Sequence, residues 1–250
     1  MEDLTIQQQA NSHTFAGRND RFFQALGRSL NRSAGAPLKV LSFGCSTGEE
    51  CLDLARILPD ANIFGTDIKR SALQKAQVTC PPDITVFMST QNAIRDHGPY
   101  DAITAMSVFC LWPATSGLEN ITEVYPFSTF ESGLLGLFQH LKPGGVLLLQ
   151  NAQYMVEDTT LADKLEPIDD IVSDSSGWIF KCAPNGDRLT TSQVDYDGRQ
   201  WSFPDFFLAN ADRIKDTTHP IEFSVSHRWT PGPEIYGRNP DIALWRKIRE

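Results

Sequence analysis

The stretch Val40-Leu41-Ser42-Phe43-Gly44-Cys45-Ser46-Thr47-Gly48-Glu49-Glu50 decides the expected fold and ligand of this 250-residue chain. Apolar residues typical of a buried strand run into a loop with two glycines four positions apart, and a helical pattern follows. Glycine has no Cβ, so the backbone can turn sharply there and come close to a ligand. This strand–loop–helix pattern predicts a nucleotide-type site at the end of the first strand of an α/β sheet.

The acidic residues that follow the second glycine narrow the kind of ligand. A helix N-terminus attracts phosphate, but Glu49 and Glu50 would repel a pyrophosphate, and the GxGxxG spacing of dinucleotide sites is missing. A ligand without phosphates and with a positive sulfonium is compatible with these carboxylates. S-adenosylmethionine, whose product after methyl transfer is S-adenosylhomocysteine, is such a ligand, and the loop residues expected to contact it are Phe43, Gly44, Cys45, Ser46, Gly48 and Glu49.

A second apolar segment ends in a carboxylate. Residues 63–66 read as a strand, and Asp67 follows, 19 residues after Gly48. An acid in this place accepts hydrogen bonds from the ribose hydroxyls of a nucleoside, although alone it would be interpreted as the cap of the next helix. Its position after the glycine loop favours the ligand role for Asp67, with Ile68 beside it.

Apolar runs alternate with helical patterns over the first 150 residues. Expected strands cover 39–43, 62–66, 84–88, 102–106 and 146–150, and expected helices cover 49–58, 71–78 and 128–141. This alternation predicts right-handed crossovers and a mostly parallel sheet with helices on both faces. The expected fold class is a Rossmann-like, doubly wound α/β fold with a seven-stranded sheet and a C-terminal insertion or lid.

The domain organisation follows from the same patterns. Residues 1–36 are interpreted as a polar leader and a helix, and 37–250 as one domain. Within it, 187–220 is expected to be an insertion or lid, because this interval is too aromatic for a disordered tail, with Trp201, Phe203, Phe206 and Phe207. Further expected elements are strands over 178–183 and 221–226 and a short helix over 241–250.

Composition argues against several classes of partner. The chain has 22 Lys+Arg and 31 Asp+Glu, a net charge of −9, which would repel a nucleic-acid backbone. Its apolar runs are far shorter than the roughly 20 residues that cross a bilayer, and its start has no secretion signal, so we expect a cytoplasmic protein with no membrane partner. The five cysteines form no CxxC pair, and neither disulfides nor a metal site is expected.

These residues resemble the class I S-adenosylmethionine-dependent methyltransferases. Within that group, the string of residues 44–50 resembles the signature of the chemotaxis-receptor glutamate methyltransferases. Residues 14–19 (TFAGRN) are similar to that family's T-x-F-F-R-[DE] segment, which implies that Arg18 lies beside the methyl and carboxylate end of the cofactor. Asn92 is similar to a family asparagine near the adenine. The resemblance covers about residues 13–155.

Two departures limit what the resemblance implies about the acceptor. Met106 and Ser107 stand where the chemotaxis enzymes have an Arg-Asn pair, and only about a dozen residues precede Thr14, where those enzymes carry a helical receptor-binding domain. We therefore carry over the cofactor site, with Met106 and Ser107 as part of it, and expect a different acceptor.

Few catalytic groups are required, because methyl transfer is an in-line displacement that depends mainly on positioning and on exclusion of water. A cation such as Arg18 would orient a carboxylate acceptor, whereas a hydroxyl or phenol needs a general base. His13, beside Thr14, and Tyr154, just past the fifth strand, are the candidates for catalysis, and Phe109, Trp112 and Tyr154 are expected to contact the acceptor.

The expected function is transfer of a methyl group to oxygen or nitrogen of a small molecule. A protein carboxyl methyltransferase of the glutamate type and a non-catalytic module that binds S-adenosylmethionine are the alternatives. No feature of the sequence determines the oligomeric state.

Overall fold

A seven-stranded sheet forms the centre of the molecule in a computed structural model that describes residues 6–9, 14–31, 36–168, 177–215, 221–230 and 237–248. The strand order is β3-β2-β1-β4-β5-β10-β6. The first five strands are parallel, and β10 runs antiparallel to both of its neighbours. The bounds are β1 (Leu38–Phe43), β2 (Ala61–Asp67), β3 (Thr85–Met88), β4 (Tyr100–Met106), β5 (Leu141–Gln150), β6 (Leu165–Pro167) and β10 (Leu244–Lys247).

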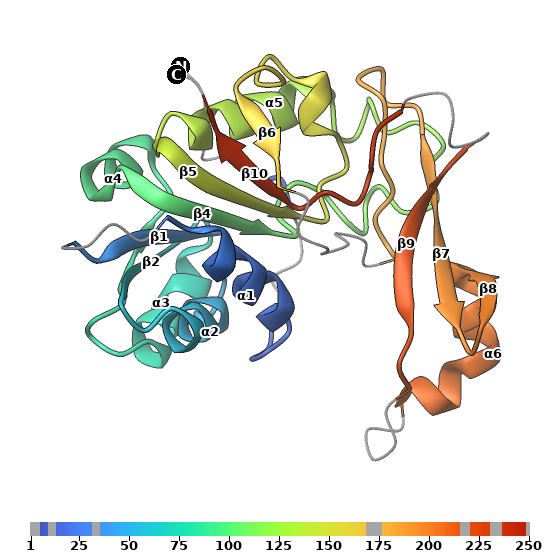
Figure 1. The fold of residues 1–250 in the computed structure, drawn as a ribbon, viewed down its shortest axis with the longest axis horizontal. Coiled ribbons are helices and arrows are strands. Elements are labelled where there is room, and N and C mark those ends of the chain that lie inside the picture. Colours follow the sequence, from blue (N-terminus) through green and yellow to red (C-terminus); the bar gives the residue numbers. More distant parts are fainter. Residues whose placement is uncertain are drawn as a thin grey trace.

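Helices cover both faces of this sheet, as Figure 1 shows. One face carries α1 (Asp20–Ser29), α2 (Glu49–Ile57) and α3 (Arg70–Thr79), and the other carries α4 (Gln91–His97) and α5 (Phe127–Phe138). Successive strand residues point to opposite faces, so the neighbours Val40 and Leu41 belong to two different apolar cores. The expected doubly wound α/β fold is confirmed.

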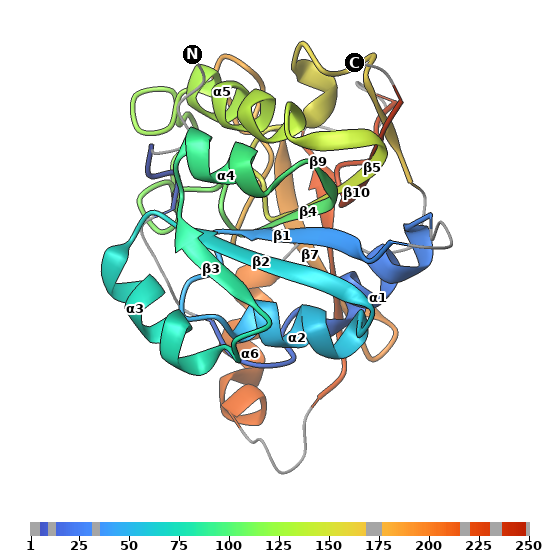
Figure 2. The same ribbon diagram turned by 90° about the vertical axis from the view of Figure 1, so that its left-hand side faces the viewer.

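The strand order creates a crevice at one edge of the sheet. The chain proceeds from β1 to β2 and β3 and then returns to place β4 on the other side of β1 (Figure 2). Helices before and after this reversal lie on opposite faces, and ligands of such sheets bind at the carboxyl ends of the strands at that point. The fold therefore places a site at the ends of β1 and β4.

A second, smaller sheet is inserted in the chain between β6 and β10. It has the order β8-β7-β9, with β7 (Thr190–Tyr196), β8 (Arg199–Ser202) and β9 (Ser224–Trp229), and it carries α6 (Phe203–Lys215). Figure 1 shows it beside the large sheet, in orange and red. Its core is its own and includes Val194, Phe203 and Phe206. An insertion is thus present and extends to β9, beyond the expected 187–220, of which 216–220 lie outside the described residues.

The expected helix over 241–250 is wrong, because its described part forms strand β10. Leu244 faces the core under α1–α3 and Trp245 faces the core under α5. Because apolar cores cover both faces of the sheet at β10, its neighbouring residues are both apolar and show no polar–apolar alternation. Its short apolar run therefore resembled one side of a helix.

Two other expected strands differ from the structure. The segment 178–183 has no strand and only an isolated bridge at Cys182, which pairs with Tyr154 and Arg188. The strand expected over 221–226 lies at Ser224–Trp229. Outside the insertion, three further short elements were not expected, namely α4, β6 and a 3-10 turn at Val156–Asp158.

Candidate active site

A cavity of about 550 Å³ opens at the carboxyl ends of β1, β2 and β4. Its volume falls within the range of small-molecule sites. The predicted cofactor residues that line it are Phe43, Gly44, Ser46, Asp67, Ile68, Met106 and Ser107, and the predicted residues Arg18 and Trp112 line it as well. The structure thus brings together side chains that are up to 94 positions apart in this group, from Arg18 to Trp112.

The loop after β1 depends on Gly44. Its φ is +80°, and a Cβ there would lie 2.6 Å from Cγ2 of Val108. The backbone N–H of Gly44 donates to the carbonyl of Thr66, at 2.8 Å. Any other residue would combine an unfavourable backbone conformation with a steric clash. The glycine therefore lets the loop run close to β4 and leaves the space above it open to a ligand.

Positive φ angles also occur at the other strand ends around the cavity. Ser46 (51°), Ser107 (57°) and Asn151 (60°) line the cavity and follow β1, β4 and β5. Non-glycine residues rarely adopt this conformation, and it clusters where side chains are held for function.

Asp67 is buried at the end of β2 and holds the glycine loop in place. Its Oδ2 accepts from the backbone N–H of Ser46 at 3.0 Å, and its Oδ1 accepts from the N–H of Lys69 at 2.8 Å. The N-cap of α3 is Lys69, so Asp67 does not cap that helix. Each carboxylate oxygen can accept a further bond, which makes Asp67 able to bind a hydroxyl pair.

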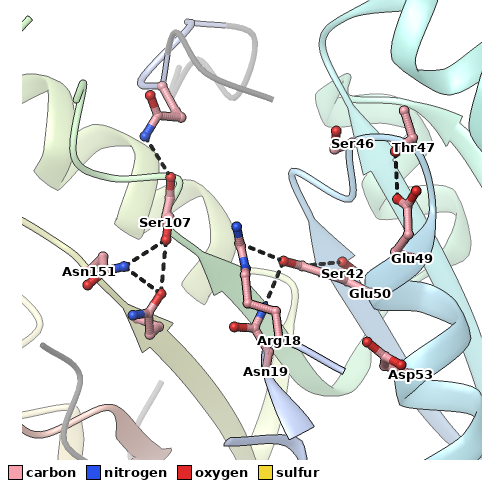
Figure 3. A network of polar contacts seen from close by, with 12 residues as sticks. Arg18, Asn19, Ser42, Ser46, Thr47, Glu49, Glu50, Asp53, Ser107 and Asn151 are labelled. Carbon is pink, nitrogen blue, oxygen red and sulfur yellow. Dashed lines mark hydrogen bonds and ion pairs between the residues drawn. The ribbon is translucent and has the colours of Figure 1, made fainter. Parts of the chain in front are cut away.

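Glu50 is the second carboxylate of the cavity, and Figure 3 shows three polar groups converging on it. Asn19 donates at 2.9 Å and Ser42 at 3.3 Å, while Nη2 of Arg18 lies 3.4 Å from Oε1. Burial raises the pKa of Glu50 to about 7, against the opposing effect of the Arg18 charge. Glu49 instead accepts from Thr47 and does not line the cavity.

The opposite wall is neutral. Ser107 donates through Oγ to Oε1 of Gln150 at 2.9 Å and accepts from Nδ2 of Asn151 at 2.8 Å (Figure 3). Nε2 of Gln9 donates to the carbonyl of Ser107 at 3.1 Å. The cavity therefore has a charged side, with Arg18, Glu50 and Asp67, and an uncharged side at the ends of β4 and β5.

Part of the leader forms a wall that sequence reasoning missed. Ile6, Gln8 and Gln9 line the cavity. Gln8 is buried, and its Oε1 accepts from the hydroxyl of Tyr125 at 2.6 Å. Its carbonyl accepts from the N–H of Leu111 at 2.9 Å. A short polar segment carries no periodic pattern, so no signal in the sequence identified this contact.

Two buried polar atoms at the cavity have no hydrogen-bond partner among the described residues. They are Oγ1 of Thr14 and Nε1 of Trp112. An unsatisfied buried donor or acceptor costs roughly 1–3 kcal/mol, so a bound ligand that supplies partners would be stabilised here. Thr14 is the first residue of the segment that resembles the methyltransferase motif.

The other predicted site residues lie away from the cavity lining. Tyr154 is buried in the core under α5, where its hydroxyl donates to the carbonyl of Tyr125 at 2.5 Å. Phe109 packs in the same core against Phe43 and Phe130. Asn92 is exposed on α4. Outside the lining too are Cys45, Gly48 and Glu49, and His13 lies outside the described residues.

The described residues contain neither a candidate metal site nor a candidate membrane span. No group of three or more His, Cys, Asp or Glu side chains among them could hold a metal ion. Within the same part of the chain, no helix is long and apolar enough to span a bilayer. All five cysteines are buried and free.

Comparison with known proteins gives a partial sequence match and distant structural ones. Residues 41–147 match a family model described as a methyltransferase domain. No curated protein sequence matches the chain. A structure of an amino pentose methyltransferase from Micromonospora echinaspora with bound S-adenosylmethionine has 20% identity and a TM-score of 0.40, over 58% of this chain and 53% of that chain.

A plantazolicin methyltransferase in complex with S-adenosylhomocysteine has 17% identity and a TM-score of 0.39, over 52% of this chain and 44% of that chain. The chain thus spans about half of the length of these structures. The narrower resemblance to the chemotaxis-receptor enzymes stays a prediction. The matched residues 41–147 run from β1 into β5 and contribute about half of the cavity lining, so this part of the chain is similar to methyltransferase domains.

Proposed function

We propose that the chain is an S-adenosylmethionine-dependent methyltransferase that acts on a small-molecule acceptor. The observation that supports it most is the glycine loop after β1 together with the buried carboxylate of Asp67 at the end of β2, both facing one cavity. The sequence match over 41–147 supports the same function. The cofactor supplies a methyl group on a positively charged sulfur, and this chain's residues bind it and orient the acceptor.

The polar groups of the cavity fit this cofactor. Asp67 has acceptor capacity left for two ribose hydroxyls. Arg18 and Glu50 lie 3.4 Å apart, and with Glu50 ionised on binding they complement the carboxylate and ammonium of an amino-acid end. A pyrophosphate bound in this cavity would lie near the carboxylates of Glu50 and Asp67, so a dinucleotide fits poorly.

Exclusion of water would come from the leader and the aromatic side chains. Gln8 and Gln9 close one side of the cavity, and Trp112 and Trp178 close another. Displacement at a sulfonium is faster in a site from which water is excluded and in which the reacting atoms are aligned. No histidine lines the cavity among the described residues, and we assign no general base.

Calorimetry with S-adenosylhomocysteine tests the cofactor assignment. We expect binding to the wild-type chain and a loss of about 2 kcal/mol, roughly 30-fold in Kd, for Asp67→Ala. Asp67→Asn, which keeps the shape, should fall between the two. Asp83→Ala is the matched control, because Asp83 is an exposed aspartate before β3. Absence of binding, or equal Kd values for Asp67→Ala and Asp83→Ala, would refute the assignment.

Catalysis is tested separately, with labelled S-adenosylmethionine and, as acceptors, a metabolite extract together with added protein. Label that appears in small molecules and is lost in Arg18→Ala supports transfer to such an acceptor. Label that appears only in added protein would favour the carboxyl methyltransferase alternative. Cofactor binding without transfer to either would favour a non-catalytic binding module.

A further inference from the structure

A second cavity, of about 710 Å³, is lined on one side by loop residues outside the inserted sheet and on the other side by residues of that sheet. One wall is formed by residues 116–117 and 177–180. The other wall is formed by β7, β8, the start of α6 and Arg228 on β9. We call this cavity the insertion cleft. The two sheets that border it stand next to each other in Figure 1.

The insertion cleft is cationic in an acidic protein. Arg188 and Arg228 line it, and the lining contains no aspartate or glutamate among the described residues, although the chain carries a net charge of −9. Nε of Arg228 donates to Oε1 of Gln193 at 2.7 Å, and Arg228 forms no ion pair with any described residue. Arg188 lies over the ring of Phe180, and its partner Glu119 is 3.8 Å away and highly exposed. The cleft therefore favours an anion.

The same cleft has an aromatic surface. Trp178 is 52% exposed and packs edge-on against Phe203, with ring centroids 4.7 Å apart. Trp201 also lines the cleft, and its Nε1 is buried without a hydrogen-bond partner among the described residues. An exposed tryptophan beside arginines suits a ligand with an apolar or aromatic body, and the indole N–H suits an acceptor atom on it.

Trp178 connects the insertion cleft with the cofactor cavity. Trp178 and Ile179 line both cavities. Trp112, on the wall of the cofactor cavity, lies 6.3 Å from Trp178 between ring centroids. A molecule that lies in the cleft against Trp178 is therefore next to the cavity in which the methyl group would be presented.

We propose that the insertion cleft binds the methyl acceptor, and that this acceptor is an anionic small molecule with an aromatic or apolar body. Its acidic group binds Arg228 and Arg188, its body lies on Trp178, and a separate oxygen or nitrogen enters the cofactor cavity. The role as acceptor rests on the proposed function, whereas the binding of such an anion does not. In the transfer, a lone pair of that atom forms the bond to the methyl carbon while the carbon–sulfur bond breaks and its electron pair stays on sulfur. Any proton on the acceptor atom leaves to solvent.

Binding of naphthoate to the full chain, with naphthamide as its neutral counterpart, tests the proposal. We expect naphthoate to bind at least roughly 10-fold more tightly, because only naphthoate carries the charge. Arg228→Gln should weaken naphthoate binding by roughly 5–10-fold and leave naphthamide unchanged. Arg228 is the chosen site because it is exposed on β9, whereas Arg188 also packs on Phe180. Arg95→Gln, at an exposed arginine on α4, is the matched control and should change neither.

Two readouts keep this proposal separate from the cofactor assignment. Naphthoate should bind equally well when the chain is saturated with S-adenosylhomocysteine, and Arg228→Gln should keep the wild-type Kd for that compound. Displacement of one by the other would place naphthoate in the cofactor cavity and overturn the proposal. Equal affinity for naphthoate and naphthamide, no binding of naphthoate at about 10 mM, or no effect of Arg228→Gln would overturn it too. A chain that binds naphthoate in this way but not S-adenosylhomocysteine would refute only the proposed function.

Discussion

The large sheet and the inserted sheet each border a cavity, and the two cavities are built differently. The large sheet has a cavity at the carboxyl ends of β1, β2 and β4. The shape of this cavity depends mainly on the backbone, because the turn at Gly44 and the ends of these strands form it. The inserted sheet borders a cleft whose character comes from side chains, namely Arg188, Arg228 and Trp178. Charges are mixed in the first and only positive among the described lining of the second.

This difference fits the proposed roles of the two sites, in which the cavity at the large sheet binds the cofactor and the insertion cleft binds the acceptor. A cofactor that is the same for many enzymes can be held by a geometry that the fold provides, whereas an acceptor is chosen by side chains on added segments. The inserted sheet has its own apolar core, with Val194, Phe203 and Phe206. It can therefore lose stability without loss of the cofactor cavity.

The largest expected effect comes from removing one buried ring in each region. Phe206→Ala should lower the unfolding free energy of the inserted sheet by about 4 kcal/mol, because Phe206 is fully buried and contacts Tyr196, Trp201 and Phe223. Amide exchange should accelerate in β7–β9, while the Kd for S-adenosylhomocysteine stays the same.

Phe130→Ala is the matched change in the large sheet's core, where Phe130 is also fully buried. It should cost a similar amount but accelerate exchange in β4 and β5 and weaken cofactor binding. If Phe206→Ala weakened cofactor binding as much as Phe130→Ala does, the two regions would not be separable and the comparison would fail.

Sequence patterns predicted the large sheet better than the insertion for a physical reason. Strands β1–β5 alternate with helices, and this repeated alternation identifies even the four-residue β3 as a strand. β10 has four residues and lies between two strands, so its pattern was interpreted as a helix. In the insertion, β7 alternates only weakly, with two fully buried positions, Thr190 and Val194.

The site divides in the same way. Gly44, Ser46 and Asp67 were predictable, because glycine spacing and a carboxylate after a strand are local signals. Gln8, Gln9 and Asn19 were not, since their roles depend on contacts with residues far away in the chain, such as Tyr125 and Glu50. Tyr154 follows a strand end as expected, but its side chain turns into the core.

The charged side of the cavity gives the next prediction. Burial raises the pKa of Glu50 from its ordinary value of 4.5 to about 7, so between these values the folded chain holds a proton that the unfolded chain releases. The stability from this group is complete below pH 4.5 and is lost as the pH rises through 7. The unfolding free energy should fall by about 3 kcal/mol over this range. In Glu50→Gln this fall should be absent from the plot of unfolding free energy against pH.

The same residue should report cofactor binding. If Glu50 pairs with the ammonium of S-adenosylhomocysteine, binding lowers its pKa and releases a proton at pH 6. Calorimetry in two buffers of different ionisation enthalpy measures that proton, and Glu50→Gln should abolish it. An unchanged pH profile and an unchanged proton release in Glu50→Gln would show that this carboxylate titrates in neither process.

The smallest expected effects come from two tyrosines, Tyr125 at the cavity wall and Tyr154 in the core beside it. Each donates one buried hydrogen bond. The hydroxyl of Tyr125 holds Gln8 on the cavity wall, and the hydroxyl of Tyr154 holds only the carbonyl of Tyr125. Tyr125→Phe and Tyr154→Phe should each lower the unfolding free energy by about 1 kcal/mol, since each loses a single hydrogen bond. Only Tyr125→Phe should raise the Kd for S-adenosylhomocysteine, because only this change removes one of the hydrogen bonds that hold Gln8 on the cavity wall.

Tyr154→Phe should also keep kcat for methyl transfer within about twofold of the wild-type value, since a hydroxyl outside the cavity cannot accept a proton from the acceptor. A large fall in kcat with unchanged stability would instead support the catalytic role that the sequence predicts for Tyr154. That result would mean that the core under α5 opens toward the cavity during turnover. Tyr154 would then belong to the cavity wall, as Tyr125 does.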